Sequence, residues 1–318
     1  MLAAAGGAVY YILVYRPAHR PPLEMAYVLA DTLEVFNSPA RVRVRVATAK
    51  LGDRVEILER SRDWAHVRLT DQTVGWAEAG GLVDVETHDR GQQLLRELKD
   101  ELPQADGHLA TVANLRLEPS RDAPQLDQLS PNQSVEVFGR RMVERPPQPG
   151  APPSTPALRE AWYLVRADSK AGWLLGRFVD LDIPDAISMY AQSANVVAWR
   201  VLNTVEDDGR QVPQYLAADR SGSQEIDFSR IRVFTWWAAR QQYATAYVES
   251  NLNGFFPIRV RERDGVPHFR LRLEDRKGDR FQKVYAMRGT IVRPVGTVEG
   301  WESEDMPERP AARPKRAR

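Results

Sequence analysis

The chain repeats one pattern of residues about a hundred positions further along. "RDWAHVRLTDQTVGWAEAGGLVD" spans Arg62–Asp84, and "EAWYLVRADSKAGWLLGRFVDLD" spans Glu160–Asp182. Each copy has a Trp, an alternating run ending in Val-Arg, a short polar turn, a Gly-Trp pair and a closing apolar-Val-Asp. Earlier landmarks precede both copies in the same order, which indicates an internal repeat rather than a coincidence of composition. We therefore expect two copies of one small module.

Short alternating runs separated by polar turns predict that both modules are built from β-strands. The fold class that we expect is mainly β, with two small barrels, a linker helix and an antiparallel C-terminal β domain. A hydrophobic helix is expected at the N-terminus. The predicted limits are 1–18 for the anchor helix, 27–84 for the first barrel, 87–102 for the linker helix, 108–182 for the second barrel with a Pro-rich loop at 145–158, 184–300 for the C-terminal domain and 301–318 for a disordered tail.

The N-terminal run Leu2–Tyr15 carries no charge and is followed by Arg16 and Arg20. As a helix it would span about 21 Å, which is shorter than the ~30 Å hydrocarbon core of a bilayer. We interpret it as a membrane anchor with interfacial arginines. The alternative is a buried N-terminal helix. Because nothing basic precedes the run, the charges alone favour a cytoplasmic C-terminal side.

The absence of cysteine excludes disulfides, thiolate metal sites and thiol nucleophiles in this chain. The net charge of +1 gives no indication of nucleic acid as a partner. The histidines have no metal-binding spacing, and we find no nucleophile elbow or phosphate-binding loop. We therefore expect no cofactor, no metal and no catalytic residues. A hydrolase within residues 185–300 would need a polar pocket that is assembled only in space.

The repeat resembles the bacterial SH3-like (SH3b) family. The second copy opens with "ANLRLEPS" (Ala113–Ser120) and continues with "NQSVEVF" (Asn132–Phe138), and both copies end with W-x-x-V-R and Gly-Trp. The first copy departs at its opening, where "TLEVFNSP" stands. The resemblance implies a binding module that is often extracytoplasmic and that recognises cell-wall peptides. The C-terminal domain resembles that of uncharacterised anchored SH3-domain proteins, and this implies no activity.

Trp and Arg side chains of the repeats are the candidate ligand-binding residues. Period two places Trp64 on the same strand face as Arg68, and Trp162 on the same face as Arg166, so that each pair could stack a flat group and bind a carboxylate. The alternative is that the tryptophans cover a small core. The candidates are Trp64, Arg68, Trp76, Trp162, Arg166 and Trp173.

Two further groups of residues carry predictions. Arg41, Arg43 and Arg45 form a stripe opposite three valines in an alternating run, interpreted as a solvated strand face or an anion-binding stripe. In the C-terminal domain, aromatic residues gather around one predicted hairpin as candidate partner-binding residues, with core packing as the alternative. These are Trp236, Trp237, Tyr243 and Tyr247.

These observations together predict a non-enzymatic binding or tethering protein of the bacterial cell envelope. Its partner would be a cell-wall peptide or an envelope protein, and the N-terminal segment would attach it to the membrane. The location that we expect is membrane-anchored, on the periplasmic or extracytoplasmic side. The alternative function is a protein–protein scaffold in which the C-terminal domain contacts the partner and the SH3-like domains are spacers.

Overall fold

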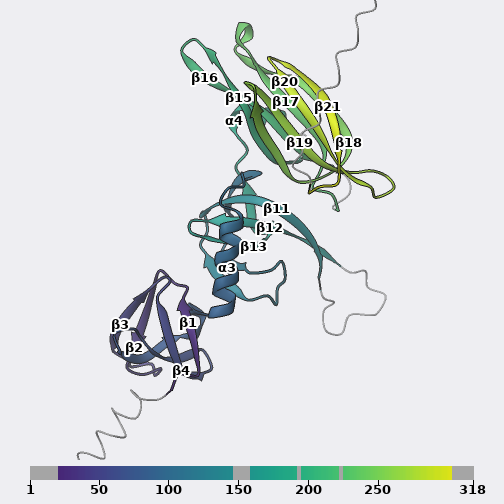
Figure 1. Ribbon diagram of the computed structural model, residues 1–318. Helices are drawn as coiled ribbons and strands as arrows, with labels where there is room; N and C mark the ends of the chain where they lie inside the picture. The colour runs from purple at the N-terminus through teal and green to yellow at the C-terminus, as the bar shows by residue number, and fades with distance from the viewer. Residues whose placement is uncertain (1–20, 146–157, 192–194, 222–224, 303–318) are drawn as a thin grey trace, which may run out of the picture. The chain divides into compact units, whose positions relative to one another are not determined.

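The computed structural model describes residues 21–145, 158–191, 195–221 and 225–302. The prediction of a mainly β chain is confirmed, because the strands form three antiparallel sheets of seven strands each (Figure 1). The predicted anchor helix and almost all of the Pro-rich loop and the tail lie outside the described residues. Within these described ranges, the helices are too short or too polar to cross a membrane.

The first sheet has the strand order β3-β2-β6-β5-β4-β1-β7. The strands are Glu24–Val28 (β1), Thr32–Phe36 (β2), Arg45–Lys50 (β3), Arg54–Ser61 (β4), Trp64–Arg68 (β5), Val74–Glu78 (β6) and Leu82–Asp84 (β7). Alternate side chains of these strands are buried, as the two-residue period of a strand requires. Val35, Ile57, Ala65 and Val67 are fully buried and belong to one core.

The second sheet has the order β10-β9-β13-β12-β11-β8-β14. Its strands are Ala105–Leu109 (β8), Ala113–Arg116 (β9), Gln125–Leu129 (β10), Ser134–Glu144 (β11), Arg159–Ala167 (β12), Lys170–Leu175 (β13) and Val179–Leu181 (β14). Adding seven to each strand number of the first sheet gives this order, so the two sheets have the same topology. The repeat in the sequence is therefore also a repeat of strand order.

The Gly of each Gly-Trp pair lies where two strands approach closely. A Cβ atom on Gly75 would lie 2.6 Å from the carbonyl oxygen of Phe36, and one on Gly172 would lie 2.8 Å from that of Arg116. Neither distance leaves room for a methyl group against a backbone atom. The same steric reason thus explains the glycine in both copies of the motif.

The linker helix is Val85–Glu97 (α3), which is shorter than predicted and begins two residues earlier. It begins there because Asp84 caps it: the backbone N–H and the hydroxyl of Thr87 both donate to the Asp84 carboxylate at 2.8 Å. Burial acts to raise the pKa of Asp84, but these bonds outweigh it and the pKa is lowered. Leu98, directly after the helix, is buried, whereas Leu102, the last residue of the predicted helix, is exposed.

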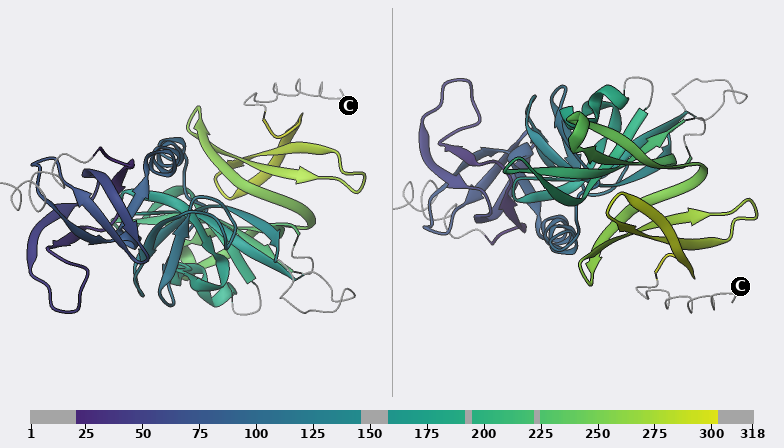
Figure 2. Two further views of the ribbon diagram at one scale, coloured as in Figure 1. Left: turned by 90° about the horizontal axis from the view of Figure 1, so that it is seen from below. Right: turned by 90° about the horizontal axis from the view of Figure 1, so that it is seen from above.

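The third sheet is a meander in which strands follow one another in sequence order, from β15 to β21. The elements are the helix Asp185–Ala191 (α4) and the strands Asn195–Asp207 (β15), Arg210–Arg220 (β16), Phe228–Trp237 (β17), Gln242–Arg263 (β18), Val266–Glu274 (β19), Arg280–Arg288 (β20) and Ile291–Glu299 (β21). The first half of β18 pairs with β17 and its second half pairs with β19. The long curved β18 bends the sheet into a half-barrel (Figure 2).

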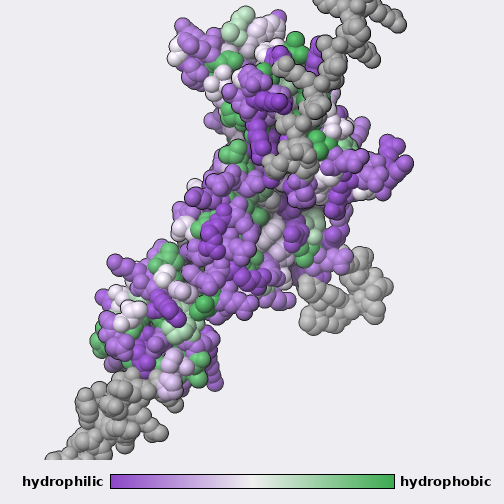
Figure 3. Space-filling view, in the orientation of Figure 1, coloured by the Kyte–Doolittle hydropathy of each residue, from purple (hydrophilic) through white to green (hydrophobic). Residues whose placement is uncertain are grey.

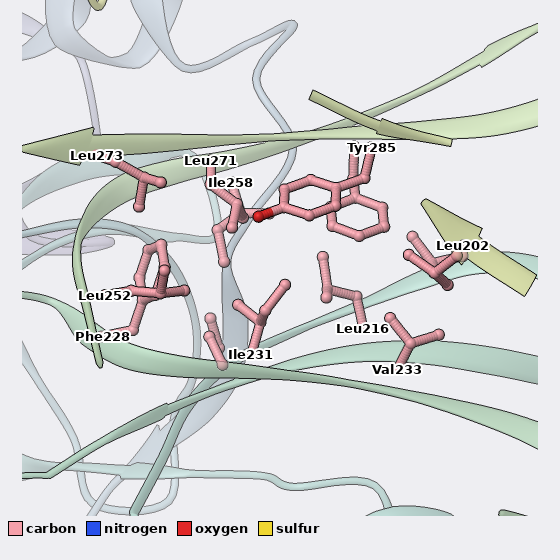
Figure 4. Packing of buried hydrophobic residues seen from close by; sticks show 14 of the residues in the cluster. Leu202, Leu216, Phe228, Ile231, Val233, Leu252, Ile258, Leu271, Leu273 and Tyr285 are labelled. Atoms are coloured by element: carbon pink, nitrogen blue, oxygen red, sulfur yellow. The ribbon is translucent and has the colours of Figure 1, made fainter. Parts of the chain in front are cut away.

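The half-barrel encloses a core cluster of buried residues. Figure 4 shows side chains from β15 to β20 meeting between the two halves of the sheet, with Ile231 and Leu271 among those labelled. Tyr285 is fully buried and stacks on Phe269 at 4.6 Å between ring centroids. Side-chain packing between the two halves of the curved sheet, rather than hydrogen bonding between edge strands, therefore holds the halves together.

Most of the second barrel and the half-barrel belong to one compact unit. Gln104 is 1% exposed, and its side-chain oxygen accepts a bond from the backbone N–H of Ile258 at 2.7 Å. Its own backbone N–H donates to Val137 in β11, and its carbonyl accepts from Trp199 in β15. Arg140 in β11 pairs with the buried carboxylate of Asp227 at 3.2 Å. These polar contacts couple β8 and β11 to the half-barrel.

Candidate functional site

The two arginines of the repeat are paired with glutamates of the same module. Arg68 in β5 is 8% exposed, and its Nη1 donates to Glu56 in β4 at 2.7 Å. In the second sheet Arg166 donates to both oxygens of Glu136, at 2.6 and 2.9 Å. Each arginine stands directly opposite its glutamate in the strand register. The Arg of W-x-x-V-R and the Glu of V-E-V or V-E-I therefore form one cross-strand pair in each copy.

The pairing changes what these arginines can do. The hydrogen bonds that Arg166 donates to Glu136 raise the pKa of Arg166, against a smaller opposing effect of burial. A guanidinium that already donates two hydrogen bonds to a carboxylate has fewer N–H groups left for a ligand. Arg68 and Arg166 thus connect β4 with β5 and β11 with β12, whatever else they contact.

The four candidate tryptophans lie in different environments. Trp162 is 3% exposed and belongs to the buried residues of the second module, which fits the interpretation of a Trp that covers the core. Trp64, Trp76 and Trp173 are partly exposed. The guanidinium of Arg141 lies 5.1 Å from the ring centroid of Trp173. A ligand can thus reach a ring of the first module more easily than Trp162.

The first barrel carries a row of four partly exposed rings, which we call the aromatic face: Phe36, Trp64, His66 and Trp76. His66 stacks on Trp76 at 4.8 Å between centroids, and Phe36 meets Trp64 edge-on at 6.0 Å. Strand pairing brings them together, since Trp76 stands opposite both His66 in β5 and Phe36 in β2. The aromatic face therefore crosses three adjacent strands.

Arg43 supplies a cation at this surface. Its guanidinium lies 4.6 Å from the ring centroid of Phe36 and 4.9 Å from that of Trp64. The loop that carries it is held by Asn37, whose backbone N–H donates to Val44 and whose side-chain oxygen accepts from the Val44 N–H, both at 3.0 Å. A guanidinium held over two rings can stack a planar group or bind a carboxylate.

The structure corrects the predicted arginine stripe. β3 begins only at Arg45, and the valines that should face a core are exposed: Val42 by 92% and Val44 by 64%. Arg45 pairs with Glu34 at 2.7 Å. The alternation came from an extended loop beyond the neighbouring strands, where neither side is covered. Figure 3 shows hydrophobic residues scattered among hydrophilic ones over the part of the molecule that holds β1–β4.

Sequence reasoning missed Phe36 as a member of a site and considered Arg43 only as part of the predicted arginine stripe. Sequence reasoning also gave no role to His66, which the two-residue period puts on the same strand face as Trp64. Phe36 ends the alternating run "TLEVF", in which Leu33 and Val35 are buried, so the period alone puts it on the outer face. Nothing in the sequence indicates that Arg43 folds back over these rings, because the path of the loop decides it.

The aromatic residues predicted as a partner surface do not form one surface. Trp236 donates to Asp207 at 2.8 Å and meets Tyr243 edge-on, whereas Tyr247 donates to Glu249 and packs against the half-barrel core. Trp237 is 43% exposed, with a guanidinium over its ring. Hydrogen bonds from Trp236 and Gln241 lower the pKa of Asp207, and burial together with Tyr215 raises the pKa of Tyr243 to about 12.

A polar cluster lies inside the half-barrel. Tyr247 and Tyr285 both donate to one oxygen of Glu249, at 2.7 and 2.8 Å, and Lys283 donates to the other at 2.6 Å. Burial raises the pKa of both tyrosines and the bonds to Glu249 raise it further. Burial opposes ionisation of Glu249 too, but the three donors outweigh it and lower its pKa. A carboxylate, two neutral phenols and an ammonium thus satisfy one another.

No cluster of metal-ligating side chains occurs among the described residues. The aromatic face has the features of a recognition surface, because it combines partly exposed rings with a cation that lies over two of them. Its composition suits flat or apolar groups that carry an anionic substituent.

Comparison with known protein families finds one family model that matches part of the chain. Residues 111–180 match the model of the family described as Bacterial SH3 domain. The resemblance predicted for the second copy is confirmed, and the chain contains one bacterial SH3 domain by this criterion. Bacterial SH3 domains commonly bind cell-wall peptidoglycan and suggest a location in the cell envelope. No curated protein matches the chain.

Three solved structures are similar to the chain at low scores. NlpC2 from Trichomonas vaginalis is 9% identical with a TM-score of 0.19, covering 73% of this chain and 98% of that one. NlpC1 from the same organism is 10% identical with a TM-score of 0.18, covering 72% and 92%. An NlpC/P60 family protein from Bacillus cereus ATCC 10987 is 12% identical with a TM-score of 0.20, covering 71% and 94%.

These matches contradict the predicted non-enzymatic binding protein and its scaffold alternative, because NlpC/P60 family proteins are cell-wall peptidases. The prediction that the chain is not an enzyme is withdrawn with them. TM-scores near 0.2 assign no activity to this chain either. Any reaction of this chain itself would proceed without a thiol nucleophile, since the chain has no cysteine.

Proposed function

We propose that this chain recognises peptidoglycan at the bacterial cell envelope and that the aromatic face of the first barrel makes the contact. The observation that carries the proposal is the row of four rings with Arg43 stacked on two of them. The first sheet shares its strand order with the matched SH3 domain, which supports treating it as a second copy of that module.

The chemistry of the surface suits this polymer. Peptidoglycan joins sugar rings, which stack on aromatic side chains, with short peptides that carry carboxylates. Trp64 and Trp76 offer large faces at low entropy cost, and Arg43 offers a guanidinium to an anion. Two copies of a module on one chain also raise avidity when both can engage the same polymer.

The test is co-sedimentation of the purified full chain with protein-free peptidoglycan sacculi, compared with the full chain alone. The parent should pellet with sacculi, and Trp64→Ala/Trp76→Ala should weaken binding by tenfold or more. A buried contact of this type costs about 2 kcal/mol or more on truncation, and about 1.4 kcal/mol corresponds to tenfold. Circular dichroism must show that the variant is folded.

Matched variants distinguish binding through the aromatic face from nonspecific binding to the sacculi. Arg43→Gln should weaken binding, whereas Arg41→Gln, an exposed arginine of the same loop, should leave it unchanged. Trp237→Ala removes an exposed ring outside the first barrel and should also have no effect. A parent that stays in the supernatant at low and moderate salt, or a Trp64→Ala/Trp76→Ala variant that pellets like the parent, contradicts the proposal.

We also propose that residues 1–18 attach the chain to the membrane on the extracytoplasmic side. The charge-free run supports the attachment, and the envelope location suggested by the SH3 domain supports the extracytoplasmic side, although Arg16 and Arg20 alone favour the opposite side. Deletion of residues 1–18 should move the protein from the membrane fraction to the soluble fraction. Protease added to intact spheroplasts should cleave the parent. Protection from that protease would place the domains on the other side.

A further inference from the structure

Trp64 in the aromatic face has a charged side chain of each sign beside it. The guanidinium of Arg43 lies 4.9 Å from its ring centroid. Glu78 stands directly opposite Trp64 in the pairing of β5 with β6, and residues opposite each other on antiparallel strands have their Cβ atoms about 5 Å apart on the same face of the sheet. Both Arg43 and Glu78 are exposed. A molecule that lies on Trp64 therefore meets a guanidinium and a carboxylate.

Arg43 and Glu78 are not neutralised within the part of the chain that the structure describes. The guanidinium of Arg43 donates to the backbone carbonyl of Ala40 at 3.5 Å, and neither Arg43 nor Glu78 forms an ion pair with a described residue. Arg43 and Glu78 can therefore each bind a group of the opposite charge that comes from a ligand. Two other arginines of the first barrel are already paired with carboxylates at 2.7 Å: Arg45 with Glu34, and Arg68 with Glu56.

The remaining charged groups near Trp64 and His66 leave this mixed character unchanged. Glu59 stands opposite His66 and is exposed, but it already interacts with other residues of the chain. Arg62 and Asp63 lie in the turn that precedes Trp64 and contribute one charge of each sign. The aromatic face therefore presents both a cation and a carboxylate rather than an excess of one sign.

A surface with both charges beside a ring is complementary to a zwitterion. A ligand that carries only a carboxylate is attracted by Arg43 but repelled by Glu78, and a ligand that carries only an ammonium has the reverse problem. A ligand with both groups satisfies both side chains, and its ammonium can also lie over an indole ring. In peptidoglycan, an uncrosslinked stem peptide carries a free ammonium on its diamino acid and a free C-terminal carboxylate. A cross-link joins such an amine to a carboxyl group of another peptide as an amide and removes both charges.

We propose that the aromatic face recognises uncrosslinked stem peptides, with Arg43 binding the free carboxylate, Glu78 binding the free ammonium and Trp64 contacting the chain between them. A guanidinium can donate two hydrogen bonds to a carboxylate while its plane stays stacked on a ring. This inference rests on the peptidoglycan recognition proposed above and names the part of the polymer that is bound. It also gives a role to Glu78, whose exposed side chain the barrel core does not need.

The test is co-sedimentation of the full chain with three preparations of the same sacculi at one ionic strength. One preparation is untreated, one has its amines acetylated with acetic anhydride, and one has its carboxyl groups amidated with carbodiimide and ammonia. The parent should bind untreated sacculi most tightly. Each modification should weaken binding by about threefold or more, which is the effect of losing one partly exposed charge pair.

Three variants assign each charge of the ligand to one side chain. Glu78→Gln should weaken binding to untreated sacculi by about threefold, and acetylation of the sacculi should then have no further effect. Arg43→Gln should in the same way become insensitive to amidation. Asp31→Asn is the control, because this exposed carboxylate lies at the other end of β2 from Phe36, and it should respond to both modifications like the parent.

Equal binding of the parent to untreated and acetylated sacculi would overturn this inference and leave peptidoglycan recognition standing. A Glu78→Gln variant that still loses affinity on acetylation as the parent does would also overturn it, because another group would then bind the ammonium. Tighter binding to either modified preparation would indicate a site for a single charge and would contradict the zwitterion. A parent that does not pellet with untreated sacculi would overturn both proposals. If Glu78→Gln does not fold, the comparison of the three preparations with the parent decides the question.

Discussion

Single residues carry the main differences between the expected and the observed site. The arginines of W-x-x-V-R were expected to bind a ligand, yet Arg68 and Arg166 each stand opposite a glutamate in the neighbouring strand. The glutamates themselves are conspicuous in the sequence as the polar residue of "VEI" and "VEV". Strand pairing brings the two motifs together, and it is not visible in either motif alone.

Glu249 gives a pH prediction at this scale. Its folded-state pKa is held below its ordinary value of 4.5 by Lys283, Tyr247 and Tyr285. The ionised carboxylate therefore stabilises the fold at pH above that ordinary value, and this contribution is lost as the pH falls through the lowered pKa. We expect Glu249→Gln to lower the free energy of unfolding by about 1–3 kcal/mol at pH 7.

The measurement is urea unfolding of parent and variant from pH 7 to pH 3. The difference in free energy between parent and Glu249→Gln should shrink as the pH falls below 4.5. Glu262→Gln, at an exposed glutamate of the same strand, is the matched control and should behave like the parent. A difference that stays constant with pH would show that the Glu249 charge does not stabilise the fold.

At the scale of elements, the sequence predicted strands well and their ends less well. Alternation indicated β-structure at Thr32–Phe36 and Trp64–Arg68, where one face is buried. It failed at residues 41–44, where the chain is extended but covered on neither side. The linker helix begins at Val85 rather than at 87 because the Asp84 side chain caps it. Alternation reports chain extension, and only neighbouring strands supply burial.

The Gly-Trp motif yields the element-scale prediction. Gly75→Ala and Gly172→Ala each put a methyl group within 3 Å of a backbone carbonyl, so the adjacent strands must separate. We expect each to lower the free energy of unfolding of its own module by about 1–3 kcal/mol or more. Chemical denaturation followed by tryptophan fluorescence would measure it.

Gly80→Ala is the control for this prediction, because a Cβ atom there meets open space. Its effect should stay within about 0.5 kcal/mol, as for most surface substitutions. If Gly75→Ala and Gly80→Ala are equally stable, close strand approach is not the reason for the glycine in the motif.

At the scale of the molecule, Gln104 couples the second barrel to the half-barrel. Gln104→Met keeps the length of the side chain but leaves the buried N–H of Ile258 without its acceptor. Such a group costs about 1–3 kcal/mol. We expect amide exchange to accelerate together in β11 and β18, since both strands belong to the same compact unit.

Hydrogen exchange read by mass spectrometry tests this coupling. Gln92→Met, at an exposed position of α3, should leave exchange in both strands unchanged. Faster exchange in β18 alone would mean that the bond is local and that the barrel and half-barrel unfold independently.

The sequence by itself determined the mainly β class, the repeat, and the Gly-Trp and V-E motifs that recur in two modules of the same strand order. These are local properties, because each strand has its own alternation of buried and exposed side chains and each glycine is required at one point where two strands lie close together. Tertiary structure alone decided that Arg68 meets a glutamate, that Arg43 lies over Phe36 and Trp64, and that Glu78 stands opposite Trp64. Which side chains meet depends on loop paths and on strands paired across long stretches of chain, and no local pattern records either.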